Sequence, residues 1–505
     1  MNEVLAKEKQ RIVEFFTNNK FLFFFISLVT VVTYSAKLFL FSYSIDTDTL
    51  ITDPVRNLNW WLRIDRYGLV LLKRFTIFGM DVNVPLINMV TYVLLAFSAC
   101  FLCYLVWRKT EMDAKYLYLA SFLYLTSPTM IEQTNFILQS AEVVLSFLFL
   151  YTAILSIQLF IESRRSAFLI ASILFTIACL SVYPSLQTAF VILSVVSVYF
   201  SLPVNEKNRI GAYFGKALPY MLVLGVSMLL NKLISIAVLR VANLEHSPYI
   251  RDASLFGKIS FSEFIRQVFV TIKTNFFAYN QYFLFVPIVL IAFAVLAMVF
   301  DRNNKNKGWT LVTLALVFVM TIFPVLYMGH IGGIRSYAPT VSIALFFLAF
   351  LLLKSLEGVK IRVLIYGMLS LFCFMQMKVT ADFGATEYIK YQQEVALAQQ
   401  LKNKFEELNA LPVENYKLAI IGTKSFDTNL MLKGDVIGKS DFEWDAGGPV
   451  GSTIRSRRFL NSQGIMISEV TPEEYPIAQQ AAADMPSYPA EGSVKVVDNI
   501  VIVKF

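Results

Sequence analysis

Two aspartates separated by a single residue are the side chains in this sequence best placed to do chemistry. Asp46 and Asp48 lie in the segment Tyr43-Ser44-Ile45-Asp46-Thr47-Asp48-Thr49, directly after the first long apolar stretch. In an extended segment both carboxylates point to the same side of the chain. There they could act as general base toward a hydroxyl group or hold a divalent cation, although a solvated loop start has the same pattern.

A basic amphipathic segment follows the two aspartates. Asp53-Pro54 is typical of a helix start, and the apolar residues after it fall on one helical face. Those apolar residues are Leu58, Trp61, Leu62, Leu69 and Leu72, and the basic ones are Arg56, Arg63, Arg66, Lys73 and Arg74. We expect one helix in the membrane interface, with Trp60 and Trp61 at headgroup depth. Its arginines suit a lipid phosphate, because a guanidinium grips two oxygens, but they could equally serve as plain anchors.

The composition places these residues in a membrane protein. The 505 residues are 56% hydrophobic and 16% charged, with a mean hydropathy of +0.60, far from the balance of a soluble domain. The net charge of +8 comes from short basic loops between apolar runs, which set membrane orientation, so nucleic-acid binding is excluded. All four cysteines fall in apolar runs and are expected to be packing residues.

Eleven apolar runs are candidates for membrane-spanning helices. They are 20–41, 84–107, 116–130, 136–160, 167–182, 186–202, 217–240, 281–300, 310–328, 337–353 and 363–378. Every other short connection is basic, which predicts a cytoplasmic N-terminus and, with an odd number of spans, an extracytoplasmic C-terminus. The first run has no convincing cleavage site after it and is interpreted as an uncleaved anchor.

The expected organisation has three parts. Residues 1–19 form a cytoplasmic N-terminus, and residues 20–378 form a transmembrane domain with outer loops at 42–83 and 241–280. Residues 379–505 form a small extracytoplasmic domain. This last part opens with a polar helical stretch from Thr386 to Leu408 and ends in β-branched runs near 494–503, which together predict an α/β fold.

Polar residues inside the apolar runs cluster toward the expected outer side. Lys37, Asn88, Gln139, Glu142, Gln187, Asn231 and Lys232 all fall in outer halves, and His330 and Arg335 lie in a short outer turn. Snorkelling accounts for Lys37, whereas Glu142 is too short to reach the interface and should face protein or water. No comparable charge is expected in the inner halves. A polar cavity open only to the outside favours an enzyme over a pump or channel, although polar spotting near helix ends is the simpler account.

Metal-binding patterns are sparse. The only histidines, His246 and His330, have no Cys or His partners at ligand spacing, so a zinc site is not expected. Outside the membrane an activated sugar must be carried on a lipid phosphate, whose departure needs cations and no proton. The expected chemistry therefore requires no cofactor, and a divalent cation is compatible with it.

The sequence resembles the glucosyltransferase II family, the phage serotype-conversion type of membrane glucosyltransferase and a branch of the C-type glycosyltransferases. The resemblance rests on 44–48, on Trp60-Trp61 to Asp65-Arg66-Tyr67-Gly68, on Ser181-Val182-Tyr183-Pro184-Ser185-Leu186-Gln187, on 386–407, and on Phe442-Glu443-Trp444-Asp445 leading into 457–460. The family often has Gly-Arg where this chain has Asp65-Arg66.

The resemblance implies transfer of a hexose, typically glucose, from a polyprenyl phosphate to a cell-surface polysaccharide at the outer face of a bacterial plasma membrane. It makes Asp46 and Asp48 the catalytic acids. In this reading the donor phosphate is bound among Arg63, Arg66, Lys232 and Arg335, and the cavity or acceptor residues are Glu142, Tyr183, Gln187 and His330. Two alternatives remain: a flippase or transporter of lipid-linked sugars, and an enzyme of the same fold that glycosylates protein.

Overall fold

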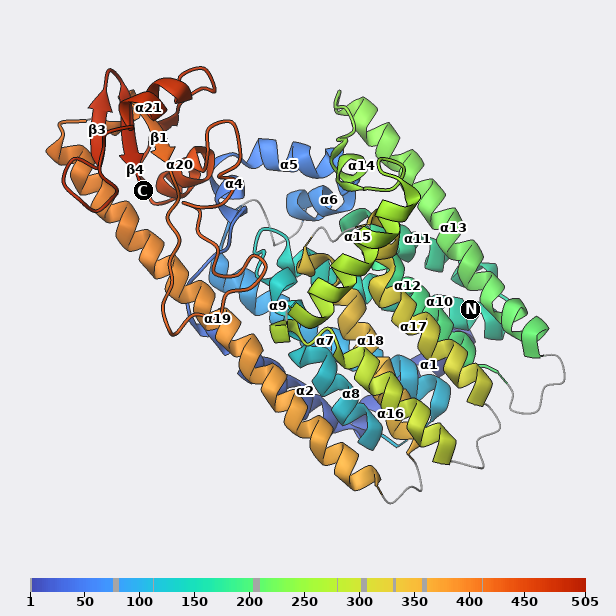
Figure 1. Cartoon of the computed structure of the whole chain (residues 1–505). Helices are drawn as coiled ribbons and strands as arrows, with labels where there is room; N and C mark the ends of the chain where they lie inside the picture. Colours follow the sequence, from blue (N-terminus) through green and yellow to red (C-terminus); the bar gives the residue numbers. More distant parts are fainter. Residues whose placement is uncertain are drawn as a thin grey trace.

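The computed structural model describes residues 2–75, 81–111, 113–202, 209–278, 280–300, 307–329, 333–356, 361–410 and 412–505. The described chain is mostly helical, and a small mixed sheet lies in its C-terminal part (Figure 1). His330, which is expected to be a cavity or acceptor residue, lies outside these residues.

The N-terminal half supplies three groups of helices. The first group is α1 (Asn2–Asn18), α2 (Lys20–Thr33) and α3 (Ser35–Phe39). The second is α4 (Thr47–Thr52), α5 (Pro54–Arg63) and α6 (Tyr67–Phe75). The third is α7 (Val84–Thr110), α8 (Lys115–Thr126), α9 (Pro128–Thr134), α10 (Ser140–Ser163), α11 (Ser166–Val182) and α12 (Leu186–Phe200).

The remaining helices of the bundle surround this half. They are α13 (Arg209–Val241), α14 (Tyr249–Ala253), α15 (Phe261–Lys273), α16 (Val286–Phe300), α17 (Lys307–Met328), α18 (Ala338–Ser355) and α19 (Arg362–Glu407). Short π or 3₁₀ turns lie at Thr274–Ala278, Asn280–Tyr282, Ile334–Ser336 and Val413–Asn415. Helix α18 lies at the centre, with nearly all its residues buried, whereas α13 is mostly exposed along one edge of the bundle (Figure 1).

Six described helices are long and apolar enough to cross a membrane, or seven if the bent pair α1 and α2 counts as one span. The chain is therefore a membrane protein. Each of the eleven expected runs contains helix, but several of those helices are short, so eleven crossings stay a prediction. The first expected run is not one straight span. The run 20–41 breaks at Tyr34, between α2 and α3, and the chain also bends by 71° just before the run, between α1 and α2.

Lys37, which follows the break at Tyr34, lies in a different environment from the one expected. Lys37 is 1% exposed, and its Nζ donates to Asn135 Oδ1 at 2.8 Å, so it does not snorkel. Buried charges also lie at the described helix ends on the opposite side of the bundle, where none was expected. There Arg108 contacts Glu8 at 2.6 Å and Glu162 at 2.7 Å. Polar groups are thus buried at both ends of the bundle.

The expected amphipathic segment forms two helices. Asp53 caps α5 by accepting from the Arg56 amide at 3.1 Å, and Pro54 occupies the first turn, as the sequence indicated. The chain then turns at Asp65, whose φ of 64° lies in the left-handed region, and α6 begins at Tyr67. The predicted apolar face is buried at Leu58, Trp61, Leu62 and Leu69.

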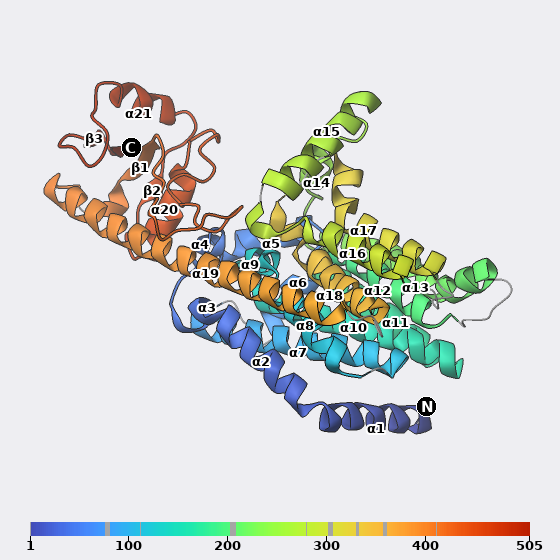
Figure 2. The same cartoon turned by 60° about the horizontal axis from the view of Figure 1, so that its bottom comes forward.

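Helix α19 connects the bundle to the C-terminal sheet without interruption (Figures 1 and 2). The sheet order is β2 (Ser468–Glu469), β1 (Lys417–Ile421), β4 (Ile500–Lys504) and β3 (Val494–Val497). Strand β1 runs parallel to β2 and β4, and β3 is antiparallel to β4. Helices α20 (Thr453–Ser462) and α21 (Tyr475–Ala481) complete this part, whose β-branched strands 494–497 and 500–504 match the sequence pattern.

Buried carboxylates of the helices fix the segment 435–441, which connects the sheet to α20. Glu132 Oε1 accepts from the Asp435 amide at 2.8 Å, and Glu387 Oε2 accepts from the Gly438 amide at 3.0 Å. Glu394 Oε1 accepts from the Asp441 amide at 2.7 Å. All three glutamates are at most 1% exposed. We call this segment, 435–441, the anchored loop.

We expect Gly434→Ala to loosen the anchored loop. A Cβ atom at position 434 would overlap the Glu132 carboxylate and the Tyr282 hydroxyl, so the loop would have to move away from its acceptor. The variant should melt at a lower temperature, and the C-terminal part should be cleaved faster in limited proteolysis. Gly447→Ala is the matched control, because a Cβ there meets no described heavy atom within 4 Å. Equal proteolysis of the two variants would contradict the role of the loop.

Candidate functional site

The segment with the two aspartates is held by short local contacts. Ser44 Oγ donates to the Asn135 carbonyl at 2.7 Å, which pins the segment to the turn between α9 and α10. Asp46 then adopts a φ of 73°, and its carbonyl accepts the Thr49 amide at 3.1 Å to start α4. Asp48 therefore lies inside the first turn of α4, and the expected extended arrangement of the two carboxylates is replaced by a helix start.

Asp46 is paired with a residue from the far end of the chain. Arg455 on α20 donates from Nη1 to Asp46 Oδ1 at 2.5 Å and from Nε to Asp445 Oδ2 at 2.6 Å. The Asp46 side chain remains 37% exposed, so another molecule can still reach it. The guanidinium offsets part of the charge of the two carboxylates and orients Asp46 at the surface of the site.

Asp48 lies behind Asp46 in a different environment. It is 0% exposed, and no described group makes a hydrogen bond of ordinary geometry with either carboxylate oxygen. Burial raises the pKa of Asp48 to about 6, and the nearby Asp46 charge adds to the effect while the Arg455 guanidinium opposes it. Burial likewise raises the pKa of the neighbouring Asp441. Asp46 and Asp48 thus lie in one site but differ in their access to solvent, because Asp46 is partly exposed and Asp48 is buried.

A second arginine clamps the same turn from α20. Arg458 Nη1 donates to Thr49 Oγ1 at 3.0 Å, one helical turn from Arg455. Both arginines were missed as site residues from the sequence. The stretches 442–445 and 457–460 were noted as part of the resemblance, but no sequence pattern joins them to residues some 409 positions earlier.

Arg66 and Arg335 both lie close to one tyrosine, Tyr183. The Arg66 guanidinium lies over the Tyr183 ring at 5.0 Å and donates to Gln139 Oε1 at 2.8 Å. Arg335 lies over the Phe136 ring at 4.9 Å, and its carbonyl oxygen lies 3.4 Å from the Tyr183 hydroxyl oxygen. We call Arg66, Tyr183 and Arg335 the arginine cluster. Burial, together with the nearby Arg335 charge, lowers the pKa of Arg66, as expected for two neighbouring cations.

Close packing of two segments builds the arginine cluster. Gly68 lies so near Ser181 that a Cβ atom at position 68 would overlap the serine side chain. This contact places 65–68 against 181–187, the two stretches that the sequence analysis singled out separately. Tyr183 is held further by its hydroxyl, which donates to Gln133 Oε1 at 2.8 Å.

The other two expected phosphate ligands do not join this cluster. Lys232 Nζ lies 3.0 Å from Asp65 Oδ2, and His246 Nε2 lies 3.0 Å from the same atom, so the lysine charge is already balanced. Arg63 Nε donates to the Glu245 carbonyl at 3.0 Å and holds the loop after α13. The left-handed turn at Asp65 separates Arg63 from Arg66, so the four cations do not converge.

The residues expected in the cavity also lie in different environments. Glu142 Oε1 lies 2.7 Å from Lys73 Nζ, and both side chains are at most 1% exposed, so Glu142 faces protein as part of a buried ion pair. Tyr183 belongs to the arginine cluster. Gln187 is half-buried in the first turn of α12. Among the described residues no group of three or more His, Cys, Asp or Glu side chains is arranged to hold a metal ion, and an optional cation stays a prediction.

We expect Asp48→Asn to stabilise the protein at neutral pH. Because the folded pKa of about 6 exceeds the ordinary value of 3.8, the folded state binds the proton more tightly, and stability falls as pH rises from about 4 to 6. Removing the charge should recover up to about 3 kcal/mol above pH 6 and less at pH 5. Melting temperatures at pH 5 and 7.5 measure this. Asp484→Asn is the exposed control in the same part of the chain, and a gain independent of pH would contradict the assignment.

The comparisons with known proteins identify the family of the chain. The family model described as Glucosyl transferase GtrII matches residues 35–353, which is more than half of the chain and includes both aspartates, Arg66, Tyr183 and Arg335. No curated protein matches the chain. The sheet, the anchored loop and α20 lie beyond the matched range. The chain belongs to the glucosyl transferase GtrII family of membrane glycosyltransferases.

Proposed function

We propose that this glucosyltransferase takes a hexose, glucose in the first instance, from a polyprenyl phosphate and transfers it to a cell-surface polysaccharide at the outer face of the membrane. The single observation that carries the proposal is that an accessible carboxylate and a separate cluster of cations both lie on one side of an apolar bundle. Asp46 supplies the carboxylate, and Arg66 and Arg335 supply the cations. The architecture is that of a C-type glycosyltransferase.

Each of these side chains has one role in the proposed reaction. Asp46 accepts the proton of the acceptor hydroxyl, whose oxygen bonds to the anomeric carbon of the donor sugar. The bond from that carbon to the phosphate oxygen breaks, and polyprenyl phosphate leaves with the electron pair. Arg66 and Arg335 stabilise its charge, so the leaving group needs no proton. Asp48 is buried next to Asp46, and its charge contributes to the electrostatic potential at Asp46.

The lipid donor fits the way the two arginines are held. A polyprenyl chain would lie among the apolar helices, while its phosphate stays at headgroup level, where α5 and α6 lie. Arg66 and Arg335 stack on aromatic rings, which leaves guanidinium N–H groups free to grip phosphate oxygens in a fork. Sugar transfer outside the cytoplasm has no nucleotide donor to use, and this also favours a lipid carrier.

We expect Asp46→Asn to remove most of the transfer activity. The amide keeps the shape of the side chain but cannot accept the proton, and loss of a general base costs about 10² to 10⁴ in rate. The assay incubates purified full-length protein with polyprenyl phosphate glucose and cell-wall polysaccharide and measures sugar transfer. Asp53→Asn, which alters only a helix cap, is the control. Turnover of Asp46→Asn within a few fold of the parent would reject the base. Donor binding without acceptor-dependent turnover in the parent would favour the flippase alternative.

We expect Arg66→Lys and Arg335→Lys each to weaken donor use by about 10- to 100-fold in kcat/KM. A lysine keeps the charge but cannot reproduce the fork, and a charge-assisted hydrogen bond is worth about 1.5–3 kcal/mol. Arg56→Lys is the matched control, because Arg56 is exposed on the neighbouring helix. Kinetics with varied lipid donor measure the effect. If all three lysine variants behave alike, the arginine cluster does not bind the phosphate.

A further inference from the structure

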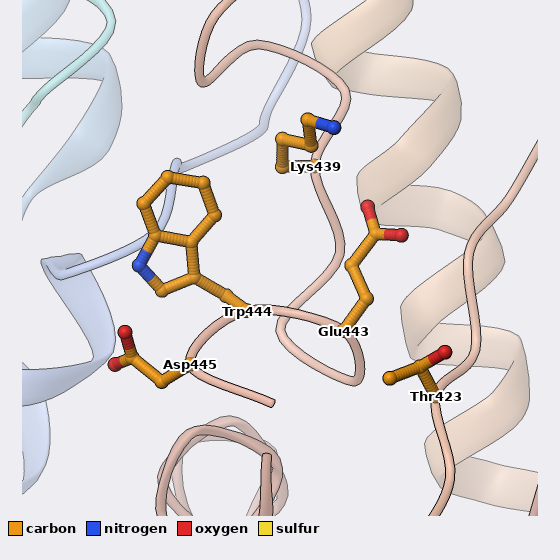
Figure 3. A pocket seen from close by; sticks show the side chains of 5 residues that line it. All are labelled: Thr423, Lys439, Glu443, Trp444 and Asp445. Carbon is orange, nitrogen blue, oxygen red and sulfur yellow. The ribbon is translucent and has the colours of Figure 1, made fainter. Parts of the chain in front are cut away.

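A cavity of about 450 Å³ opens in the C-terminal part of the chain, outside the range that defines the family. Thr423, Lys439, Glu443, Trp444 and Asp445 line it (Figure 3). In the close-up the indole of Trp444 and the Asp445 carboxylate lie on one side and Thr423 lies on the opposite side. The mechanism proposed above uses none of these five residues.

The lining has the chemistry that a sugar ring requires. A pyranose presents C–H groups on its faces and hydroxyls around its edge, so it is bound by an aromatic plane ringed by hydrogen-bonding groups. Trp444 provides the plane, and it is half-buried because part of its side chain packs against the core of the helical bundle. Glu443, Lys439 and Thr423 provide acceptors and donors for hydroxyl groups.

The charge of the lining favours a neutral sugar. Asp445 is bonded to Arg455 at 2.6 Å, but that guanidinium is shared with Asp46, so the Lys439 ammonium is the single cation in the described lining, which holds two carboxylates, Glu443 and Asp445. A uronic acid or sialic acid would place a further carboxylate beside Glu443 and Asp445, and like charges in one site repel. Uncharged hexoses meet no such penalty.

The cavity is rigid before anything binds. The anchored loop runs directly into Glu443 and Trp444, and Glu132, Glu387 and Glu394 hold its backbone. Within the next turn Glu443 Oε1 accepts from the Ser440 amide at 3.0 Å. A platform fixed in this way spends little entropy on ordering when a ligand arrives.

The cavity is joined to the reacting carboxylate by one side chain. Asp445 on its wall and Asp46 at the site share the same guanidinium, with Arg455 bonded to the first at 2.6 Å and to the second at 2.5 Å. A glycan seated on Trp444 therefore has a neighbouring residue within the reach of Asp46. Two adjoining positions of this kind suit a chain of sugars better than a single free sugar.

We propose that this cavity is a subsite for the acceptor, in which Trp444 stacks on a neutral hexose unit next to the one that receives the transferred sugar. The inference rests on the proposed function for its acceptor class. Glu443 and Lys439 hydrogen-bond the hydroxyls of that unit, and Asp445 keeps Arg455 in place between the subsite and Asp46.

The test varies Trp444 in full-length protein and measures the acceptor and the donor separately. The acceptor probe is the surface polysaccharide purified from cells that make this protein. Trp444→Ala should raise the KM for this polysaccharide by about tenfold, with little change in kcat or in the KM for polyprenyl phosphate glucose. Trp444→Phe, which keeps an aromatic plane, should recover part of the affinity. Leu430→Ala is the matched control, because Leu430 is 78% exposed in the same domain and outside the cavity lining.

A binding measurement separates this subsite from the proposed function. Isothermal titration calorimetry of the Asp46→Asn variant with the same polysaccharide should show binding that Trp444→Ala weakens by a similar factor. Unchanged acceptor KM and unchanged binding in Trp444→Ala would overturn the subsite even if glucose transfer proceeds. Binding that depends on Trp444, with no transfer from the lipid donor, would uphold the subsite and reject the proposed donor.

Discussion

The contact between buried carboxylates and the backbone of the anchored loop holds the candidate site together. Three glutamates from α9 and α19 accept amide protons from a segment that is distant from Glu132 in the chain. Each such charge-assisted bond is worth about 1.5–3 kcal/mol, and an acceptor left alone inside the protein costs a comparable amount. The loop and the glutamates therefore stabilise each other, and neither arrangement is favourable alone.

The anchored loop positions the segments that surround the site. Toward the sheet it leads to Trp444 and Asp445, and from there to α20, which carries Arg455 and Arg458. Toward the bundle Asp435 Oδ2 accepts the Ile334 amide at 2.9 Å, next to Arg335 of the arginine cluster. The loop thus lies beside the arginine cluster at Asp435, and its Asp441 is near enough to Asp48 for their charges to interact. Lys390, at 2.9 Å from Glu387 and 3.1 Å from Glu394, offsets part of the negative charge that this anchoring concentrates.

Local patterns in the sequence predict much of this structure. Apolar runs indicate the helices, Asp53-Pro54 indicates the start of α5, and the Asp-x-Asp pair marks the acid segment because its residues are neighbours in the chain. Pairings between distant residues are not encoded in such patterns. Nothing near Asp46 points to Arg455, and nothing in α13 shows that Asp65 neutralises Lys232. The break at Asp65 was missed for another reason, since a left-handed residue interrupts a helix without disturbing its apolar spacing.

Helix α19 has 46 residues, about 69 Å at 1.5 Å per residue, roughly twice the thickness of the hydrocarbon layer. One continuous rod therefore carries the bundle at one end and Glu387, Lys390 and Glu394 further along. Each residue added to or removed from the rod shifts its far part by about 1.5 Å and rotates it by about 100°. A change of one residue below Glu387 would turn all three side chains away from the loop they hold. The number of residues in that stretch is consequently as constrained as the chemistry of any side chain in it, because even a whole added turn, which restores the direction of the side chains, displaces them by about 5.4 Å.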